Sequence, residues 1–201
     1  KIAITITAAS DSQTYNGSAL TNATVSVTSG SLIEGDYLVA TATGSATNVA
    51  DTAEGNNPIA EGYKIMNGEG EAAVEVTEQY EITAVDGTLT INPKAVTVTA
   101  KSEAFTYDGQ AHSNAGYEVV GLVGDDEISA VVTGSITYPD ENPVTNKLES
   151  YEFTTGTPGN YEVTTEDGQL TMSYGEKIAI TITAASDSQT YNGSALTNAT
   201  V

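Results

Sequence analysis

The sequence contains no cysteine, no tryptophan and no arginine. Without cysteine, the chain can form neither disulfide bonds nor thiolate metal sites, and it has no thiol nucleophile. The single histidine, His112, would have to carry any serine–histidine–acid triad alone, and the sequence has no nucleophile-elbow motif. We therefore predict that the chain is not an enzyme.

Positive charge is also scarce, because six lysines stand against 27 acidic residues and the formal net charge is −21. Nucleic-acid binding needs a basic surface that displaces counterions, and anionic membranes attract basic segments. We therefore expect no nucleic-acid partner. No apolar run reaches the roughly 18 residues that a membrane-spanning helix needs, so we expect no membrane insertion.

An alternation of apolar residues with threonine marks the extended parts of the chain. Ile4 and Ile6 alternate with threonine near the start, and Val96 and Val98 do so near the middle. A period of two is typical of strands with one buried face. Asn-Gly and Asp-Gly dipeptides between such runs are typical of turns. The pattern predicts an all-β chain, and no segment indicates a helix.

One long stretch occurs twice. Residues 1–25 are identical to residues 177–201. Folding does not require such identity, because a strand tolerates many residues at each site, so the copy indicates a tandem repeat. The copied stretch is too short to bury a core of its own. We therefore predict that residues 177–201 are the start of the next repeat copy.

A weaker repeat lies inside the long one and divides it in two. Four motifs recur in the same order: TYNG (14–17) with TYDG (106–109), TGSAT (43–47) with TGSIT (133–137), YEIT (80–83) with YEVT (161–164), and DGTLTI (86–91) with DGQLTM (167–172). This order predicts two homologous domains. The first covers residues 1–93 and the second covers residues 94–176.

The two predicted domains differ in length. Tyr15 and Tyr80 lie 65 positions apart, whereas their counterparts Tyr107 and Tyr161 lie 54 positions apart. We expect the additional residues within the Gly- and Asn-rich stretch 48–70, because such a composition suits a loop.

The junctions between domains differ as well. Leu89 and Ile91 stand at odd positions and Val96 and Val98 at even ones, which predicts that the buried side changes across Pro93. This joint has almost no linker, and proline stiffens it. The next junction is longer and contains glycine, so we expect it to be the looser one.

The repeated motifs form a distinctive combination. TYNG or TYDG comes first, a Gly-Asp pair follows (35–36 and 124–125), and the Y-x-[IV]-T and D-G-x-L-T-[IM] motifs lead into the start KAVTVTA (94–100). Over nearly the whole chain, this order resembles the MBG/YDG family of bacterial surface repeats, which occur in tandem in very large exported adhesin-like proteins. The resemblance implies an extracellular, non-enzymatic module at the cell surface, and it identifies no ligand.

Both domains are expected to be immunoglobulin-like β-sandwiches, followed by the first strand region of a third. The YEVT motif, the Asp-Gly pair and the next apolar run are typical of a final hairpin. Tyr161 and Val163 would face the core on one strand, and Leu170 and Met172 on the next. The alternative is a β-grasp repeat, which would require a helix.

Acidic residues beside a glycine turn are the candidates for binding a cation. Asp125, Asp126 and Glu127 offer carboxylate oxygens on one loop, and Asp36 is their counterpart in the first domain. The sequence has no D-x-D-x-D-G loop, and a solvated turn is the competing interpretation. A structural Ca²⁺ ion is the only cofactor hypothesis that the sequence offers.

These observations favour a structural repeat module that forms an extended rod, stalk or fibre of an extracellular bacterial surface protein. Its partners would be neighbouring repeats of the same chain or other copies of itself in a fibre. Two alternatives stay open. The module could be an adhesin that binds a host glycan or protein, or it could be a self-assembling filament subunit linked by strand exchange.

The copied stretch at the C-terminal end leads to a structural expectation. It corresponds to the first strand of a domain, and a lone strand is stable only when other strands pair with it. We expect the segment 178–184, through Ile178, Ile180 and Ile182, to pair with another chain or with the next copy.

Covalent self-crosslinking is a further hypothesis, because surface rods without disulfides sometimes join a lysine to an asparagine beside a buried acid. Lys94 and Lys101, near first strands, could face a late-strand asparagine such as Asn160. Each such bond would lower the intact mass by one ammonia, which mass spectrometry of the purified protein measures. An unchanged mass would contradict the hypothesis.

Overall fold

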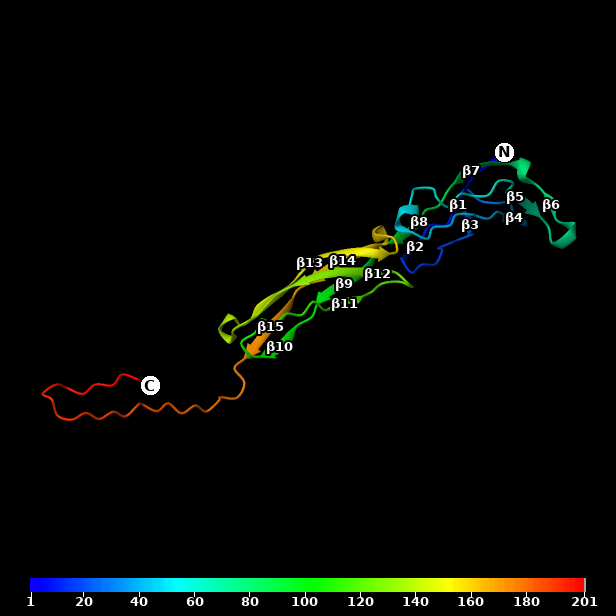
Figure 1. Cartoon of the computed structure of the whole chain (residues 1–201). Coiled ribbons are helices and arrows are strands. Elements are labelled where there is room, and N and C mark those ends of the chain that lie inside the picture. Colours follow the sequence, from blue (N-terminus) through cyan, green and yellow to red (C-terminus); the bar gives the residue numbers. More distant parts are fainter. Residues whose placement is uncertain (201) are drawn as a thin grey trace.

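The computed structural model describes residues 1–200, which form strands joined by loops and short 3₁₀ turns (Figure 1). The strands of the first domain are β1 (Ile2–Ala8), β2 (Asp11–Thr14), β3 (Val25–Ser29), β4 (Asp36–Val39), β5 (Lys64–Asn67), β6 (Val74–Glu75), β7 (Tyr80–Val85) and β8 (Leu89–Asn92). Those of the second are β9 (Lys94–Ala100), β10 (Glu103–Thr106), β11 (Tyr117–Val120), β12 (Glu127–Thr133), β13 (Val144–Thr155), β14 (Tyr161–Glu166) and β15 (Gly168–Ser173).

The helical content is limited to five 3₁₀ turns of three residues each: η1 (Val49–Asp51), η2 (Gly70–Ala72), η3 (Thr77–Gln79), η4 (Pro139–Glu141) and η5 (Pro158–Asn160). The chain is therefore all-β with several sheets, as predicted for a sandwich-type fold. The β-grasp alternative would need a longer helix, and the described residues contain none.

The first and last segments of each domain run in parallel along its whole length. In the first domain, β1 pairs in parallel with β7 and antiparallel with β3, and β2 pairs in parallel with β8. Ile2 lies opposite Tyr80 and Asp11 lies opposite Leu89, which is the same offset on both sides of the bend. The second domain repeats this arrangement, with β9 beside β14 and β10 beside β15. Parallel end segments place the entry and exit of each domain at opposite poles (Figure 1).

The predicted final hairpin is wrong. β14 pairs with β9, whereas β15 pairs with β10 and β13 in another sheet. The glycine of the Asp-Gly pair lies in a bend where the chain passes from one sheet to the next. Glycine is needed there because the backbone of the neighbouring segment approaches closely. A side chain on Gly87 would place its Cβ 2.2 Å from the carbonyl oxygen of Ala9, and one on Gly168 would lie 2.5 Å from that of Lys101. The Asp-Gly pair therefore marks a crossover.

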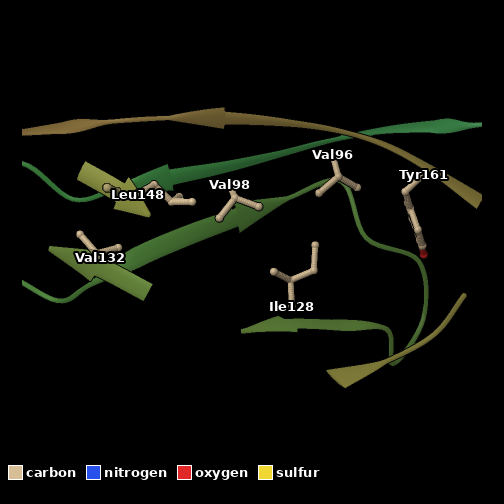
Figure 2. Packing of buried hydrophobic residues seen from close by; sticks show 7 residues of the cluster. Val96, Val98, Ile128, Val132, Leu148 and Tyr161 are labelled. Atoms are coloured by element: carbon tan, nitrogen blue, oxygen red, sulfur yellow. The ribbon is translucent and has the colours of Figure 1, made fainter. Parts of the chain in front are cut away.

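Each domain holds two small apolar clusters in series. The front cluster of the first domain consists of Ile4, Ile6, Ile65 and Tyr80, and its rear cluster of Ala46, Leu89 and Ile91. The front cluster of the second domain joins residues of β9, β12, β13 and β14, which face one another across two layers (Figure 2): Val96, Val98, Ala100, Ile128, Val132, Leu148 and Tyr161. Its rear cluster consists of Ile136, Leu170 and Met172.

The change of the buried side across Pro93 is confirmed. Leu89 and Ile91 are almost fully buried in the first domain, and Val96 and Val98 are almost fully buried in the second. Tyr161, Leu170 and Met172 are also buried, as predicted, although they do not lie on one hairpin. Burial followed from the alternation of residues, whereas the pairing of the strands did not.

The additional residues of the first domain lie mainly outside the predicted stretch 48–70. Gly68 directly follows β5 and Gly156 directly follows β13, which are the second strands of the antiparallel pairs β4–β5 and β12–β13. Both glycines have positive φ angles. Twelve positions separate Gly68 from Tyr80, whereas five separate Gly156 from Tyr161. The longer connection forms η2, β6 and η3, and β6 adds a short edge strand beside β5.

A buried asparagine fastens the bend in each domain. The backbone N–H and carbonyl groups of Asn57 both hydrogen-bond with those of Gly87. The side chain of Asn57 donates to the carbonyl oxygens of Ala9 and Asn22, each at 2.8 Å. Asn146 lies opposite Gly168, and its side chain donates to the carbonyl oxygens of Lys101 at 2.7 Å and of Asn114 at 2.8 Å. Both asparagines are fully buried. They tie the two parallel segments together where the chain changes sheets.

Replacing Asn57 with alanine should destabilise the first domain by about 2 kcal/mol or more, because two buried carbonyl groups would lose their donor. The amide oxygen of Asn57 also accepts the backbone N–H of Gly44 at 2.9 Å, whereas that of Asn146 has no donor. We therefore expect Asn146→Ala to cost less than Asn57→Ala. Urea unfolding measures both, with the exposed Asn92→Ala as control. Equal stability of all three variants would contradict a fastening role.

Candidate functional site: the contact between the domains

The two domains touch through an aromatic contact beside Pro93. Tyr15 follows β2, and its ring meets that of Tyr161 edge to face, with centroids 5.4 Å apart and an interplanar angle of 83°. Edge-to-face pairs are favourable beyond the area that they bury. Tyr15 packs on the rear cluster of the first domain and on the front cluster of the second. One side chain therefore belongs to both cores.

A polar contact lies next to this pair. Asn160 of η5 is 1% exposed, and its amide nitrogen donates to Oδ1 of Asn48 at 2.8 Å. Its amide oxygen accepts the backbone N–H of Val49 at 2.9 Å. The turn at Gly17 completes the contact, because a Cβ there would lie 3.2 Å from Cγ1 of Val123. The domains are thus held by both apolar and hydrogen-bonding groups.

The loop that carries Asn48 and Val49 is held by an acidic side chain. One oxygen of Asp51 accepts the backbone N–H groups of Thr47 at 2.9 Å and of Asn48 at 2.7 Å. Both hydrogen bonds hold the pKa of Asp51 below its ordinary value, and the one from Asn48 has the larger effect. The charged carboxylate therefore fixes the surface that the first domain presents to Asn160.

The sequence pattern alone does not predict this contact. It marks Tyr15 as a tyrosine that recurs at Tyr107 and Asn160 as a crosslinking candidate, and it places neither of them against the other domain. Asn160 is the counterpart of Gln79, just before the tyrosine of the Y-x-[IV]-T motif, and the two letters alone do not show that one of these amides is buried against another domain.

Asp36 and Asp126, two of the calcium candidates, each accept a hydrogen bond from a tyrosine hydroxyl. The hydroxyl of Tyr80 donates to Asp36 and accepts the backbone N–H of Ile33 at 2.9 Å. Tyr161 does the same with Asp126 and with the N–H of Val123, at 3.1 Å for the latter. The counterpart of Asp36 is therefore Asp126. Burial, together with the neighbouring carboxylate, raises the pKa of Tyr80 and of Tyr161, so both hydroxyls stay protonated at neutral pH.

The remaining calcium candidates lie on the same loop without forming a cluster. The backbone carbonyl of Asp125 accepts the hydroxyl of Thr155 at 2.7 Å, and Glu127 begins β12 opposite the same residue. Within residues 1–200, no three histidine or acidic side chains are grouped as ligands for a metal ion. The carboxylates of Asp36 and Asp126 instead accept hydrogen bonds from Tyr80 and Tyr161, which belong to the front clusters of the two domains.

The crosslinking candidates are only partly brought together. Lys94 lies opposite Tyr161 in the parallel ladder, one position from Asn160, whereas Lys101 lies at the bend. The amide of Asn160 is engaged with Asn48 and Val49. A lysine–asparagine bond therefore stays a prediction that mass spectrometry has to decide.

Among residues 1–200, the copied stretch pairs with no strand. Ile180 and Ile182 are 77% and 71% exposed, whereas Ile4 and Ile6 at the matching positions are 3% and 0% exposed. Ile178 is 88% exposed, and its counterpart Ile2 is 38% exposed. The stretch extends beyond the second domain, on the side away from the first (Figure 1). Its expected pairing with another chain therefore stays a prediction.

The far end of the second domain carries a group of exposed tyrosines. The ring of Tyr107 lies 6.1 Å from that of Tyr138 and 6.2 Å from that of Tyr174. Beside them, Asp108 contacts His112 at 2.9 Å, and this hydrogen bond keeps the pKa of Asp108 below its ordinary value. Tyr107 and Tyr174, with residues 175–178, line an open hollow of about 780 Å³.

This arrangement defines the chain as an all-β protein of two serially joined domains. Comparisons of the chain with known protein families, curated proteins and solved structures give no match. No helix among residues 1–200 has the length and hydropathy to span a membrane.

Acidification should loosen the contact between the domains. A carboxyl group whose pKa is lowered by folding stabilises the fold above its ordinary pKa, here 3.8, and this stabilisation is lost as the pH falls through the lower folded value. We expect the distance distribution between spin labels at Ser26→Cys and Ser150→Cys, one on each domain, to broaden below about pH 4.

The Asp51→Ala variant is the control for this titration. It should show a broadened distribution already at neutral pH, and it should change less than the unmodified contact on acidification. A variant that keeps a narrow distribution at neutral pH would rule out a role of Asp51 in the contact.

Proposed function

We propose that the chain is a structural repeat module that forms an extended rod, stalk or fibre of an extracellular bacterial surface protein. The observation that carries the proposal is the end-to-end contact of the two domains, in which Tyr15 joins both cores and Asn160 binds the preceding domain. Domains that share buried groups bend less freely than domains on a flexible linker.

The direction of the strands supports an extended shape. Because the first and last segments of each domain are parallel, the chain enters at one pole and leaves at the other. Domains with this topology add length with each repeat. The acidic composition supports the same function, since a net charge of −21 favours solubility and repulsion between chains that lie side by side.

The tyrosine-lined hollow also bears on the adhesin alternative. A site of this kind could bind a sugar through Tyr107 and Tyr174. However, Tyr107 is the counterpart of Tyr15, the residue with which the first domain meets the second. This correspondence favours another domain as the occupant of that end, and therefore a structural module.

Substituting Asn160 should test the rod. Asn160→Ala leaves Asn48 and the N–H of Val49 without their partner, which we expect to weaken docking by about 1–3 kcal/mol. With spin labels at Ser26→Cys and Ser150→Cys, the otherwise unmodified protein should give one narrow distance distribution, and Asn160→Ala should broaden it.

Gln79→Ala is the matched control, because Gln79 occupies the same position in η3 of the first domain and is exposed. It should leave the distance distribution unchanged. If the distribution is already broad with Asn160 intact, the domains move as free beads and the rod proposal fails.

A further inference from the structure

The loop that the first domain presents to Asn160 has a counterpart at the far end of the second domain. The carboxylate of Asp51 accepts two backbone N–H groups just before η1 and at its start, and that of Glu141 does the same at η4, at 2.7 and 3.1 Å. The backbone N–H of each acidic residue also donates to the residue that precedes its turn, at 2.9 and 3.1 Å. Both domains therefore end in the same backbone structure.

The groups that these two loops present are different. Asn48 and Val49, here called the amide loop, supply the side-chain oxygen and the backbone N–H that bind Asn160. The matching residues of the second domain are Tyr138 and Pro139, here called the aromatic loop. Proline has no N–H, and a tyrosine hydroxyl lies further from the backbone than an asparagine amide. The aromatic loop therefore cannot bind an asparagine as the amide loop does.

The surfaces that receive these loops differ as well. The second domain meets the first with Val123 and Asn160, here called the Val–Asn face. The counterparts in the first domain are Ile33 and Gln79, here called the Ile–Gln face, and both are exposed. In each domain the N–H of the aliphatic residue donates to the hydroxyl of the core tyrosine, and the amide residue directly precedes that tyrosine. Each side chain of the Ile–Gln face is one methylene larger than its counterpart.

We propose that these differences form a matching rule with two kinds of joint. The amide loop fits the Val–Asn face, as it does between the two domains, and the aromatic loop fits the Ile–Gln face of a first domain in the next repeat copy. Domains of the two types would then have to alternate. This inference deepens the proposed function and rests on it, because it states which domain can follow which along the rod.

The aromatic loop suits the larger face. The ring of Tyr138 lies 6.1 Å from that of Tyr107, the counterpart of the contact residue Tyr15, and both rings are exposed. The additional methylenes of the Ile–Gln face bring more aliphatic surface to these rings, and burial of apolar surface drives association. The two hydroxyl groups remain as donors and acceptors for the glutamine amide.

Either mismatch would be unfavourable. On an aromatic loop, the amide oxygen of Asn160 would face Pro139 and would lose the N–H that it now accepts from Val49. On an amide loop, the longer Gln79 would have to enter a contact in which the shorter asparagine is already fully buried. Discrimination between partners often depends on such unpaired or overpacked groups. The rule therefore has a repulsive as well as an attractive part.

The order of the sequence agrees with the rule. Residues 177–201 follow the second domain and repeat residues 1–25, which start a domain of the first type. The start of the second type, KAVTVTA (94–100), is different. The sequence therefore predicts that the aromatic loop is followed by a domain that carries the Ile–Gln face.

Exchanging the loops within the existing contact tests the rule. Asn48→Tyr with Val49→Pro turns the amide loop into an aromatic loop that meets the unchanged Val–Asn face. The turn η1 accepts this change, because proline suits the first position of a turn and Asn48 already has the extended backbone that a following proline requires (φ −108°, ψ 159°). With spin labels at Ser26→Cys and Ser150→Cys, we expect the single narrow distance distribution to be lost.

The complementary change is Val123→Ile with Asn160→Gln, which turns the Val–Asn face into an Ile–Gln face. On its own, this pair should also lose the narrow distribution. All four substitutions together create a matched aromatic joint, and we expect the narrow distribution to return, since residues in contact are energetically coupled. The rule is wrong if either pair alone keeps the narrow distribution, or if the fourfold variant is as broad as the two pairs.

Tyr138→Asn with Pro139→Val is the matched control. It makes the reverse exchange at the far end of the second domain, away from the labelled contact, and should leave the distribution unchanged. Broadening by this control would contradict the rule. The changes at residues 123 and 160 lie outside the first domain, so a narrow distribution with this pair would overturn the rule even if the change in η1 unfolded that domain.

The proposed function and the matching rule fail in different ways. A broad distribution in the protein that carries only the labels would refute the rod. A narrow distribution there, together with loops and faces that can be exchanged freely, would keep the rod and discard the rule.

Discussion

The parallel pairing between the first and last segments of each domain is the constraint on which the rest of the structure depends. Parallel strands cannot be joined by a tight turn, so the pairing closes only after the whole domain has been traversed. The pairing of the first segment is therefore complete only when the last one arrives. Residues 1–24 and 177–200 illustrate this dependence, because the same sequence forms strands in one place and stays unpaired in the other. Local propensity gives the bend and the turn, and distant partners give the strand.

The pairing also explains which residues recur between the domains. Both parallel segments change sheets at the same height, and the two backbones approach so closely there that only glycine fits at Gly87 and Gly168. The carbonyl groups exposed by the bend need donors, which Asn57 and Asn146 supply. These four residues fulfil one requirement. Long parallel segments that bend together must satisfy the backbone groups that the bend releases.

The sequence predicts some levels of this structure well and others poorly. Alternation identified the strands, the buried Leu89, Ile91, Leu170 and Met172, and the change of buried side at Pro93, because burial depends on residue type and spacing. Strand pairing was missed, since an Asp-Gly pair suits a hairpin and a crossover equally and only contacts between distant segments decide between them. The role of Asn160 was missed for a related reason. A buried asparagine and an exposed one are the same letter, and the difference arises from Asn48 and Val49 of another domain.

The distribution of charge and apolar groups limits where copies of such a chain could associate. Six lysines offset few of the 27 acidic residues, so chains that lie side by side repel one another. The contact between the domains is made by tyrosine rings, an amide and backbone groups, none of which bears a charge, and the far end of the second domain presents Tyr107, Tyr138 and Tyr174. Repulsion between chains that lie side by side, combined with a contact between successive domains that is made by uncharged groups, favours growth in length over growth in width. The arrangement that lets one domain follow another within the chain is therefore the one that copies of the chain could adopt with least electrostatic cost.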